Sequence, residues 1–187
     1  MTAEHSARPA PFPRERPDRM RIPEALAMRG FSLRSLHEGD LPWLRDLYAT
    51  TRAEEMAPVP WPEAAKRAFL DQQFDLQHRH YLAHYGDADF LALEQEGRGP
   101  VGRYYLRRAA PDHLLIDISL FPMLRGGGLG SALIGQSQRE AATLARGMRL
   151  HVLEANPGAR RLYERLGFVV EGGEGGYRAM RWSPASS

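Results

Sequence analysis

The sequence predicts an α+β fold, in which a mixed but mostly antiparallel sheet of about seven strands is flanked by about four helices. Three observations predict it. Segments with strand and helix patterns follow one another in the order β, α, α, β, β, β, α, β, α, β, β. Short turns join neighbouring strands into two antiparallel hairpins. One glycine-rich turn leads from the most apolar strand through a helix to another strand, as a parallel crossover requires.

Length and composition are those of one globular domain. The chain has 187 residues, of which 43% are hydrophobic and 26% charged. The absence of cysteine excludes a disulfide scaffold and a thiolate nucleophile or metal ligand. A net charge of +2 does not suggest nucleic-acid binding. The sequence contains neither an apolar run long enough to span a membrane nor an apolar signal core, so we expect a cytoplasmic protein without membrane contact.

The ends of the chain differ from its middle. Residues 1–28 contain four prolines between Pro9 and Pro17, several arginines and few apolar residues. They predict a mobile tail, with a basic partner-binding arm as the alternative. A single domain is expected over residues 29–183, followed by a short tail at 184–187.

The first half of the domain is predicted to hold a strand, two helices and a hairpin. The first strand shows alternating polarity, and Asp40 after it is a candidate helix N-cap. Prolines at 58–62 separate two stretches with helical spacing, and Gly86 is placed to end the second. The predicted elements are strand 31–36, helices 41–48 and 70–85, and hairpin strands 90–93 and 101–106.

The second half begins with the most apolar run, which predicts a central strand. Asn156 and Pro157 are typical of a helix N-cap and first turn, and Gly167 of a helix end. The predicted elements are strand 113–121, a helix from the glycine-rich turn to near residue 147, strand 148–153, helix 156–166, and closing strands 168–171 and 177–182.

The stretch from Leu120 to Ser131 carries the strongest functional signal. A strand end is followed by Pro122, Arg125 and then four glycines among five residues, before leucines recur at helical spacing. A helix N-terminus offers unpaired N–H groups and the positive end of the dipole, and glycines let the backbone approach a phosphate. The stretch predicts a phosphate-binding loop. A glycine-rich loop without a ligand is the alternative.

Three kinds of glycine-rich loop were compared with this stretch. A P-loop needs a lysine between the last glycine and Ser131, and none is present. The dinucleotide fingerprint G-x-G-x-x-G needs a third glycine, where the chain has Ser131 or Leu133 at the two offsets. The third pattern is R-G-x-G-x-G after a strand and a proline. It is complete in Arg125, Gly126, Gly128 and Gly130.

This third loop resembles the coenzyme A loop of the GCN5-related N-acetyltransferase (GNAT) superfamily. Residues Asn156–Phe168 match a second family pattern, N-x-x-A-x-x-L-Y-x-x-x-G-F. The order of elements from about Phe31 to Trp182 is also similar to the GNAT fold. The resemblance covers most of the chain and implies a GNAT-like acetyltransferase domain.

The resemblance implies acetyl-CoA as co-substrate, and no metal is expected because the sequence has no H-E-x-x-H or similar ligand set. The pyrophosphate is expected on the loop backbone, with Arg125 as ligand or as anchor. The pantetheine arm is expected along the strand end at Ser119–Phe121, where a backbone N–H near Leu120 or Phe121 would polarise the thioester. Asn156 is expected as a helix cap that also lies near the pantetheine. The predicted cofactor-binding residues are Leu120, Phe121, Arg125, Gly126, Gly127, Gly128, Leu129, Gly130, Ser131 and Asn156.

Three residues are candidates for catalysis. Tyr163 matches the family tyrosine that often donates a proton to the leaving thiolate, although it also shares an apolar helix face and could be a packing residue. Asp117 on the central strand and Glu154 at the end of the next strand are both candidates for the general base. Either carboxylate could instead be structural, and the sequence leaves the choice open.

The predicted reaction is direct transfer of the acetyl group to a primary amine of a small molecule within a ternary complex. Alternatives are a protein or peptide acceptor and a non-catalytic coenzyme A sensor. The histidines His78, His80 and His84 are expected to wall the acceptor site or face solvent, because no carboxylate completes a metal triad. The acceptor, the base and the oligomeric state, a homodimer included, stay open.

Overall fold

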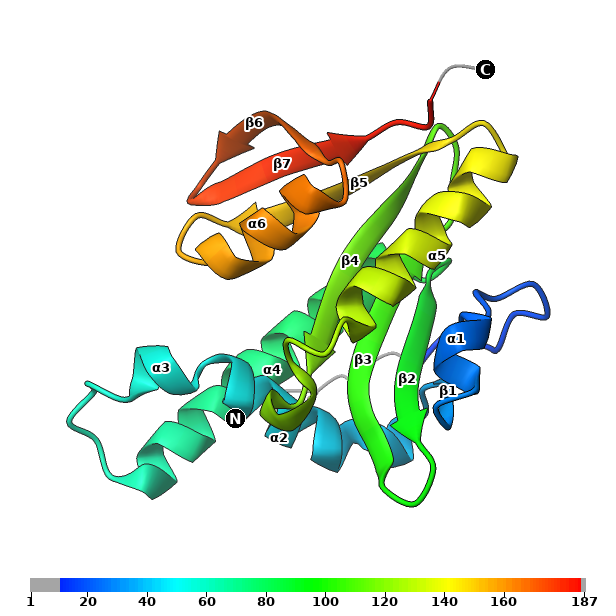
Figure 1. Ribbon diagram of the computed structural model, residues 1–187. Coiled ribbons are helices and arrows are strands. Elements are labelled where there is room, and N and C mark those ends of the chain that lie inside the picture. Colours follow the sequence, from blue (N-terminus) through cyan, green and yellow to red (C-terminus); the bar gives the residue numbers. More distant parts are fainter. Residues whose placement is uncertain (1–10, 186–187) are drawn as a thin grey trace, which may run out of the picture.

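The computed structural model describes residues 11–185, which form a seven-stranded sheet with helices on both faces (Figure 1). The strand order is β1-β2-β3-β4-β5-β7-β6, and every neighbouring pair is antiparallel except β4 and β5. The predicted α+β class and the central place of the most apolar strand are confirmed. The strands are β1 (Phe31–Ser35), β2 (Asp89–Gln95), β3 (Gly99–Arg107), β4 (Asp112–Leu120), β5 (Gly147–Leu153), β6 (Val169–Glu174) and β7 (Tyr177–Trp182).

The helices divide the apolar core into two layers. One layer lies between the sheet and α5 with α6, and the other lies between the sheet and α2 with α4. Two helices beyond the predicted four, α1 and α3, have four residues each, which is too short to show a periodic pattern. The helices are α1 (Glu24–Ala27), α2 (Leu41–Thr51), α3 (Ala53–Met56), α4 (Glu63–His84), α5 (Leu129–Thr143) and α6 (Pro157–Arg165), with 3-10 turns at Glu38–Asp40 and Pro122–Leu124.

Asp40 has a different role from the predicted N-cap of the following helix. Its carboxylate makes no cap bond to α2. It accepts hydrogen bonds from Arg34, from the indole N–H of Trp43 and from the backbone N–H of His37. Burial alone would raise the pKa of Asp40, but these donors outweigh it and lower the pKa to about 2. Asp40 therefore ties β1 to the start of α2.

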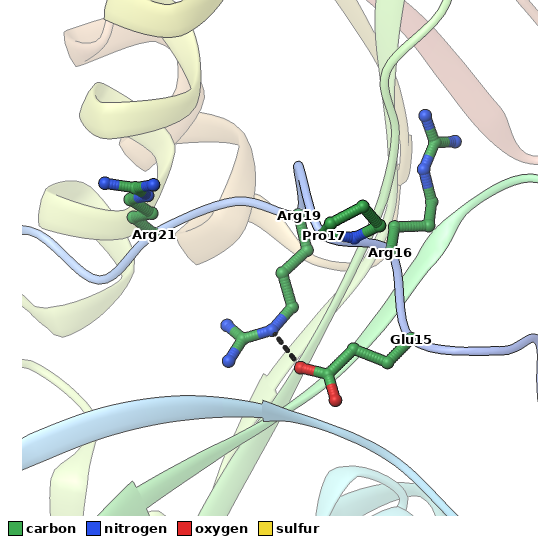
Figure 2. Close-up of a pocket in the computed structure, with 5 residues that line it drawn as sticks. All are labelled: Glu15, Arg16, Pro17, Arg19 and Arg21. Atoms are coloured by element: carbon green, nitrogen blue, oxygen red, sulfur yellow. Dashed lines mark hydrogen bonds and ion pairs between the residues drawn. The ribbon is translucent and has the colours of Figure 1, made fainter.

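The N-terminal segment also differs from the prediction of a mobile tail over 1–28. Residues 1–10 lie outside the described part, but residues 11–28 pack on the domain, with Phe12, Met20 and Leu26 buried. Three apolar side chains are enough because each enters a core that the sheet already forms. Figure 2 shows the turn between Phe12 and Met20, where Glu15 pairs with Arg19. These two residues border a shallow hollow of about 430 Å³. None of the helices within residues 11–185 is long and apolar enough to cross a membrane.

The two central strands β4 and β5 are paired over only part of their length. Their parallel pairing covers Asp112–Leu115 and Gly147–Leu150. Ile116 follows as the extra residue of a β-bulge against β3. A bulge bends its strand, and beyond it β4 stays with β3 while β5 stays with β7. Figure 1 shows the two strands starting together and diverging, so that their inner edges have no strand partner.

Candidate active site

The glycine-rich loop joins the open end of β4 to the N-terminus of α5. Gly126 and Gly128 have φ of +76° and +78°, in the left-handed region that favours glycine. Gly128 is the N-cap of α5, and its carbonyl accepts the first backbone bond, from Ala132. Within residues 11–185, none of the backbone N–H groups from Gly126 to Ser131 finds a backbone or side-chain acceptor. The loop therefore presents a row of free donors at the positive end of a helix.

The side chain of Arg125 anchors this loop. Its Nε donates to the carbonyl of Leu120 at 2.9 Å, and its Nη2 donates to the Thr50 hydroxyl at 3.1 Å. These bonds tie the loop to β4 and to α2. Of the two roles expected for Arg125, the structure shows the anchor.

The end of β4 distinguishes the two backbone positions proposed to face a thioester. The Phe121 N–H donates to the carbonyl of Val101 in β3 at 3.0 Å. Backbone groups of successive strand residues point to opposite edges. The N–H and C=O of Leu120 therefore point to the open edge, where its carbonyl already receives Arg125. Leu120, and not Phe121, has the N–H on the side of the β4–β5 opening.

A cleft of about 650 Å³ lies at this opening. Side chains from both faces of the split sheet reach it, together with residues of α4, α6 and the β6–β7 hairpin. None of its lining residues is an arginine or a lysine, in a chain with 25 such residues. The lining is made of Gln77, His80, Tyr81, Tyr85, Leu114, Leu115, Ile116, Asp117, Ile118, Ser119, His151, Val152, Leu153, Asn156, Ala159, Tyr163, Glu174 and Tyr177.

Tyr163 enters the cleft from α6. Its ring packs edge-on against Phe168, with the ring centres 6.0 Å apart, and only 8% of the residue is exposed. Burial, with a smaller contribution from the negative charge of Asp117, raises the pKa of Tyr163 to about 12. The phenol therefore keeps its proton near neutral pH. No hydrogen-bond partner of its hydroxyl is found in the described part of the chain.

Asp117 lies in the cleft wall, but its oxygens are already engaged. It forms a two-bond ion pair with the buried Arg103, at 2.8 Å and 3.1 Å. Ser119 donates to it at 2.9 Å and Tyr81 at 3.3 Å. Burial alone would lower the pKa of Arg103. The negative charge of Asp117 outweighs this effect and holds the pKa of Arg103 above its usual value. Four hydrogen bonds already occupy its two oxygens, which leaves little room for the proton of an acceptor amine.

Glu154 and Asn156 flank the cleft after β5. Glu154 is exposed, pairs with Arg178 at 2.8 Å and is not part of the cleft lining. Asn156 does line the cleft, and its Oδ1 accepts the backbone N–H of Ala159 at 3.0 Å. The expected N-cap of α6 is thus present. Glu154 shares none of the cleft geometry that a base would need.

The three histidines of α4 face different ways. His78 is buried and stacks on Phe74, with ring centres 5.6 Å apart, while His80 lines the cleft and His84 is exposed. Burial and the charge of Arg103 lower the pKa of His78 to about 4, so it is a neutral core residue. Among residues 11–185, no three His, Cys, Asp or Glu side chains gather in a way that could hold a metal ion.

Several cleft residues carry no sequence motif. The cleft is lined by His151 on β5, Tyr81 on α4, Tyr85 just after α4, and Tyr177 on β7. They come from elements far apart in the chain, and only the sheet topology brings them together. The alternation of β5 is the one signal that could have found His151, since it falls between the buried Leu150 and Val152 and points to the other face.

Comparison with known proteins identifies the relatives of the chain. The family model for the acetyltransferase (GNAT) family matches residues 44–168. No curated protein matches the sequence.

Solved structures with the same fold include three acetyltransferases. The PaiA N-acetyltransferase of Thermoplasma acidophilum, in complex with coenzyme A, is 18% identical with a TM-score of 0.63, over 82% of this chain and 99% of that one. A histone acetyltransferase and related acetyltransferase from Corynebacterium glutamicum is 22% identical with a TM-score of 0.60, over 84% and 98%. A spermidine N-acetyltransferase of Vibrio cholerae, in complex with CoA and spermine, is 22% identical with a TM-score of 0.53, over 81% and 93%.

Proposed function

Because this chain belongs to the acetyltransferase (GNAT) family, we propose that it uses acetyl-CoA to acetylate the primary amine of a small molecule. The observation that carries this proposal is the opening between β4 and β5. The cleft there is lined by a tyrosine that stays protonated, the β4 edge beside it has no strand partner beyond Leu115, and the loop that follows this strand has free backbone donors. Each of these is what one part of an acetyl-CoA transfer site requires.

Coenzyme A would be held by backbone groups. Its pyrophosphate would accept hydrogen bonds from the N–H groups between Gly126 and Ser131, where the absence of side chains on three consecutive glycines permits close approach. The amides of the pantetheine arm would pair with the open edge of β4, as an added strand does. In this arrangement the Leu120 N–H faces the thioester carbonyl and stabilises the oxyanion that forms there.

The chemistry requires an acid for the leaving thiolate. The amine nitrogen attacks the thioester carbon, and the C–S bond then breaks. Tyr163 is suited to donate the proton, because its pKa of about 12 keeps the phenol protonated and the residue lines the cleft. Leu120 and Tyr163 thus act on the carbonyl oxygen and on the sulfur respectively.

The cleft favours a small amine that carries no acidic group. Tyrosine and histidine rings dominate its polar lining, and they suit an alkyl or aromatic ammonium group through cation–π contact. No arginine or lysine in the lining could pair with a carboxylate or phosphate of the acceptor. Spermine in the Vibrio cholerae structure is an amine of this kind.

The test is release of coenzyme A thiol from acetyl-CoA. The chain has no cysteine, so every thiol detected comes from the cofactor. Benzylamine, spermidine, glutamate and an alanine tripeptide serve as acceptors. We expect turnover with the first two and little with glutamate. Preference for the peptide would indicate the protein acceptor instead. Coenzyme A binding without turnover on any amine would indicate a sensor, and calorimetric binding of NAD without coenzyme A would overturn the cofactor assignment.

A further inference from the structure

We propose that His151 is the general base that takes the proton from the acceptor amine. This inference rests on the proposed function, because it assigns a residue to that same reaction. It replaces neither Tyr163 nor the oxyanion donor, but it does replace the two carboxylates that the sequence offered as bases.

His151 stands at the first position of β5 beyond its pairing with β4, which ends at Leu150. It is exposed and lines the cleft. Within residues 11–185 it forms no hydrogen bond or ion pair, so its ring nitrogens are available to a ligand. Its neighbours across the sheet are small, Ala179 on β7 and then Gly172 on β6. These two residues leave open space beside the imidazole.

The face on which His151 lies is opposite to that of the proposed acid. Leu150 and Val152 point into the core layer of α5 and α6, and Tyr163 belongs to the same layer. His151, which lies between them on the strand, therefore points to the α4 face. A thioester in the β4–β5 opening would have the acid on one face and the base on the other. The amine could then enter from the α4 face while the thiolate is protonated from the α6 face.

The competing bases are less available. Asp117 receives hydrogen bonds from Arg103, Ser119 and Tyr81, and Glu154 is paired with Arg178 outside the cleft lining. His80 is the remaining rival, since it also lines the cleft from α4. Its ring centre lies 4.1 Å from that of His84, so a second imidazole already occupies one side of the ring.

Charged and titratable groups lie around His151, and the charged ones other than Glu174 are already paired. On its own face of the sheet, Arg149 and Arg181 both bind Asp112. The groups facing the cleft from the packed elements are Asp117 on β4, His80 and Tyr81 on α4, Tyr85 just after α4, Tyr163 on α6, Glu174 on β6 and Tyr177 on β7. Glu174 is the one carboxylate of this lining without an ion pair in the described residues, and it favours a cationic amine near the imidazole.

The proposed step is balanced within the site. The amine nitrogen forms a bond to the carbonyl carbon and becomes positively charged. An unprotonated ring nitrogen of His151 accepts one proton from it, and the C–S bond breaks as Tyr163 donates its proton to the sulfur. The products are the acetylated amine and coenzyme A. Solvent then takes the proton from His151 and restores that of Tyr163.

The experiment measures kcat/KM for benzylamine and spermidine between pH 5.5 and 9, by thiol release, in wild type and variants. Histidine is the side chain that changes charge in the lower part of this range. We expect His151→Gln to lower kcat/KM by about 100-fold at pH 7 and to abolish the ionisation of the enzyme on the acidic side, leaving only that of the amine. Coenzyme A affinity should change by less than about 2-fold, since the ring is absent from the loop.

Two further variants make the result specific. His84→Gln carries the same change on an exposed helix position outside the cleft lining and should match wild type. Added imidazole should restore activity to His151→Ala, which a merely structural role would not allow. The inference is overturned if His151→Gln keeps the acidic ionisation, or if His80→Gln is the variant that loses it. If wild type binds coenzyme A but acetylates neither amine, the proposed function is wrong, and the role of His151 as its base is wrong for the same reason.

Discussion

The strand β4 lies in two different environments along its length. Over Asp112–Leu115 it is paired on both edges, by β3 and by β5, and its polar side chains are buried there. Over Ile116–Leu120 the edge toward β5 is free, and the side chains from Ile116 to Ser119 line the cleft, which Leu114 and Leu115 also reach. The change occurs at the bulge of Ile116. One inserted residue therefore separates a half with strand partners on both edges from a half with one free edge, which we propose binds coenzyme A.

The polar groups of the two halves follow this division. In the paired half, Asp112 is buried between Arg149 at 2.8 Å and Arg181 at 3.0 Å, which closes the sheet where β4, β5 and β7 meet. In the open half, the N–H of Leu120 points to an edge that has no strand partner. His151 lies across the opening, just beyond the last residue of β5 that pairs with β4. Changes in the paired half should therefore affect stability, and changes at the open half should affect binding and rate.

The largest effect is expected at the loop that follows the open half. Gly128→Val places a branched side chain at φ +78° and a Cβ in the proposed phosphate path. We expect coenzyme A affinity to fall by at least about 100-fold, or about 3 kcal/mol, with a folded domain. Calorimetry measures it. Gly97→Val has the same strain, at φ +72° with nothing within 4 Å, in the β2–β3 turn. Equal loss of affinity in both variants would contradict a specific role of the loop.

A change in the paired half should do the opposite. A Cβ on Gly147 would collide with the Asp112 carboxylate and lie 2.7 Å from the carbonyl oxygen of Trp182. Gly147→Ala must therefore separate strands, and we expect it to lower the free energy of unfolding by about 2–3 kcal/mol. Urea unfolding measures this. Gly135→Ala on α5, whose Cβ would meet only the flexible end of Arg139 at 3.6 Å, is the control and should be neutral or stabilising. Coenzyme A affinity of folded Gly147→Ala should be retained.

The third effect concerns rate without affinity. Tyr163→Phe keeps the ring that packs on Phe168 but removes the proton that the leaving thiolate needs. We expect kcat to fall by about 30-fold, or about 2 kcal/mol, with coenzyme A affinity and stability nearly unchanged. Tyr48→Phe, in the other core layer, should leave kcat as in wild type. Unchanged turnover in Tyr163→Phe would reduce this tyrosine to a packing residue.

Sequence patterns predicted the parts of the site that are local. The glycine loop and the helix capped by Asn156 are continuous segments, and their turns and caps are properties of a few adjacent residues. The roles of Asp117 and His151 depend on what lies across the sheet. Arg103, which engages Asp117, is 14 residues away, and the bulge at Ile116 decides which side chains meet in the opening. Neither leaves a pattern in the adjacent sequence.

The N-terminal segment shows the same limit from another side. Its proline and arginine content predicts a tail, because too few apolar residues are present to form a core of their own. Met20 and Leu26 nevertheless enter a core built by residues far along the chain, the cluster that also contains Leu133 and Ile134 of α5. Composition measures what a segment can bury by itself and does not measure what it can bury against a finished sheet.

The smallest effect distinguishes the two halves by pH. His113, in the paired half of β4, is buried, and neither ring nitrogen has a partner within residues 11–185. Burial and the charges of Arg146 and Arg108 lower its pKa from 6.5 to about 4. The unfolded chain therefore takes up a proton as the pH falls through about 6.5, while the folded chain does so only near pH 4. The stability contribution is complete above pH 6.5 and is lost as the pH falls toward 4.

His113→Leu removes this ionisation while keeping a side chain of similar size. At pH 5.5, one unit below the ordinary histidine value, the lost contribution of His113 is about 1.4 kcal/mol. Urea unfolding measures the free energy of unfolding at pH 7.5 and at pH 5.5. We expect this free energy to fall less in the variant than in wild type, by the amount given above. The fall that remains in the variant is due to other groups such as His78. In the control His84→Gln, at an exposed position, the free energy of unfolding should fall with pH as much as in wild type. An equal decline in His113→Leu would show that His113 is protonated in the folded state, and the paired half of β4 would then be open to solvent in the same way as the half that lines the cleft.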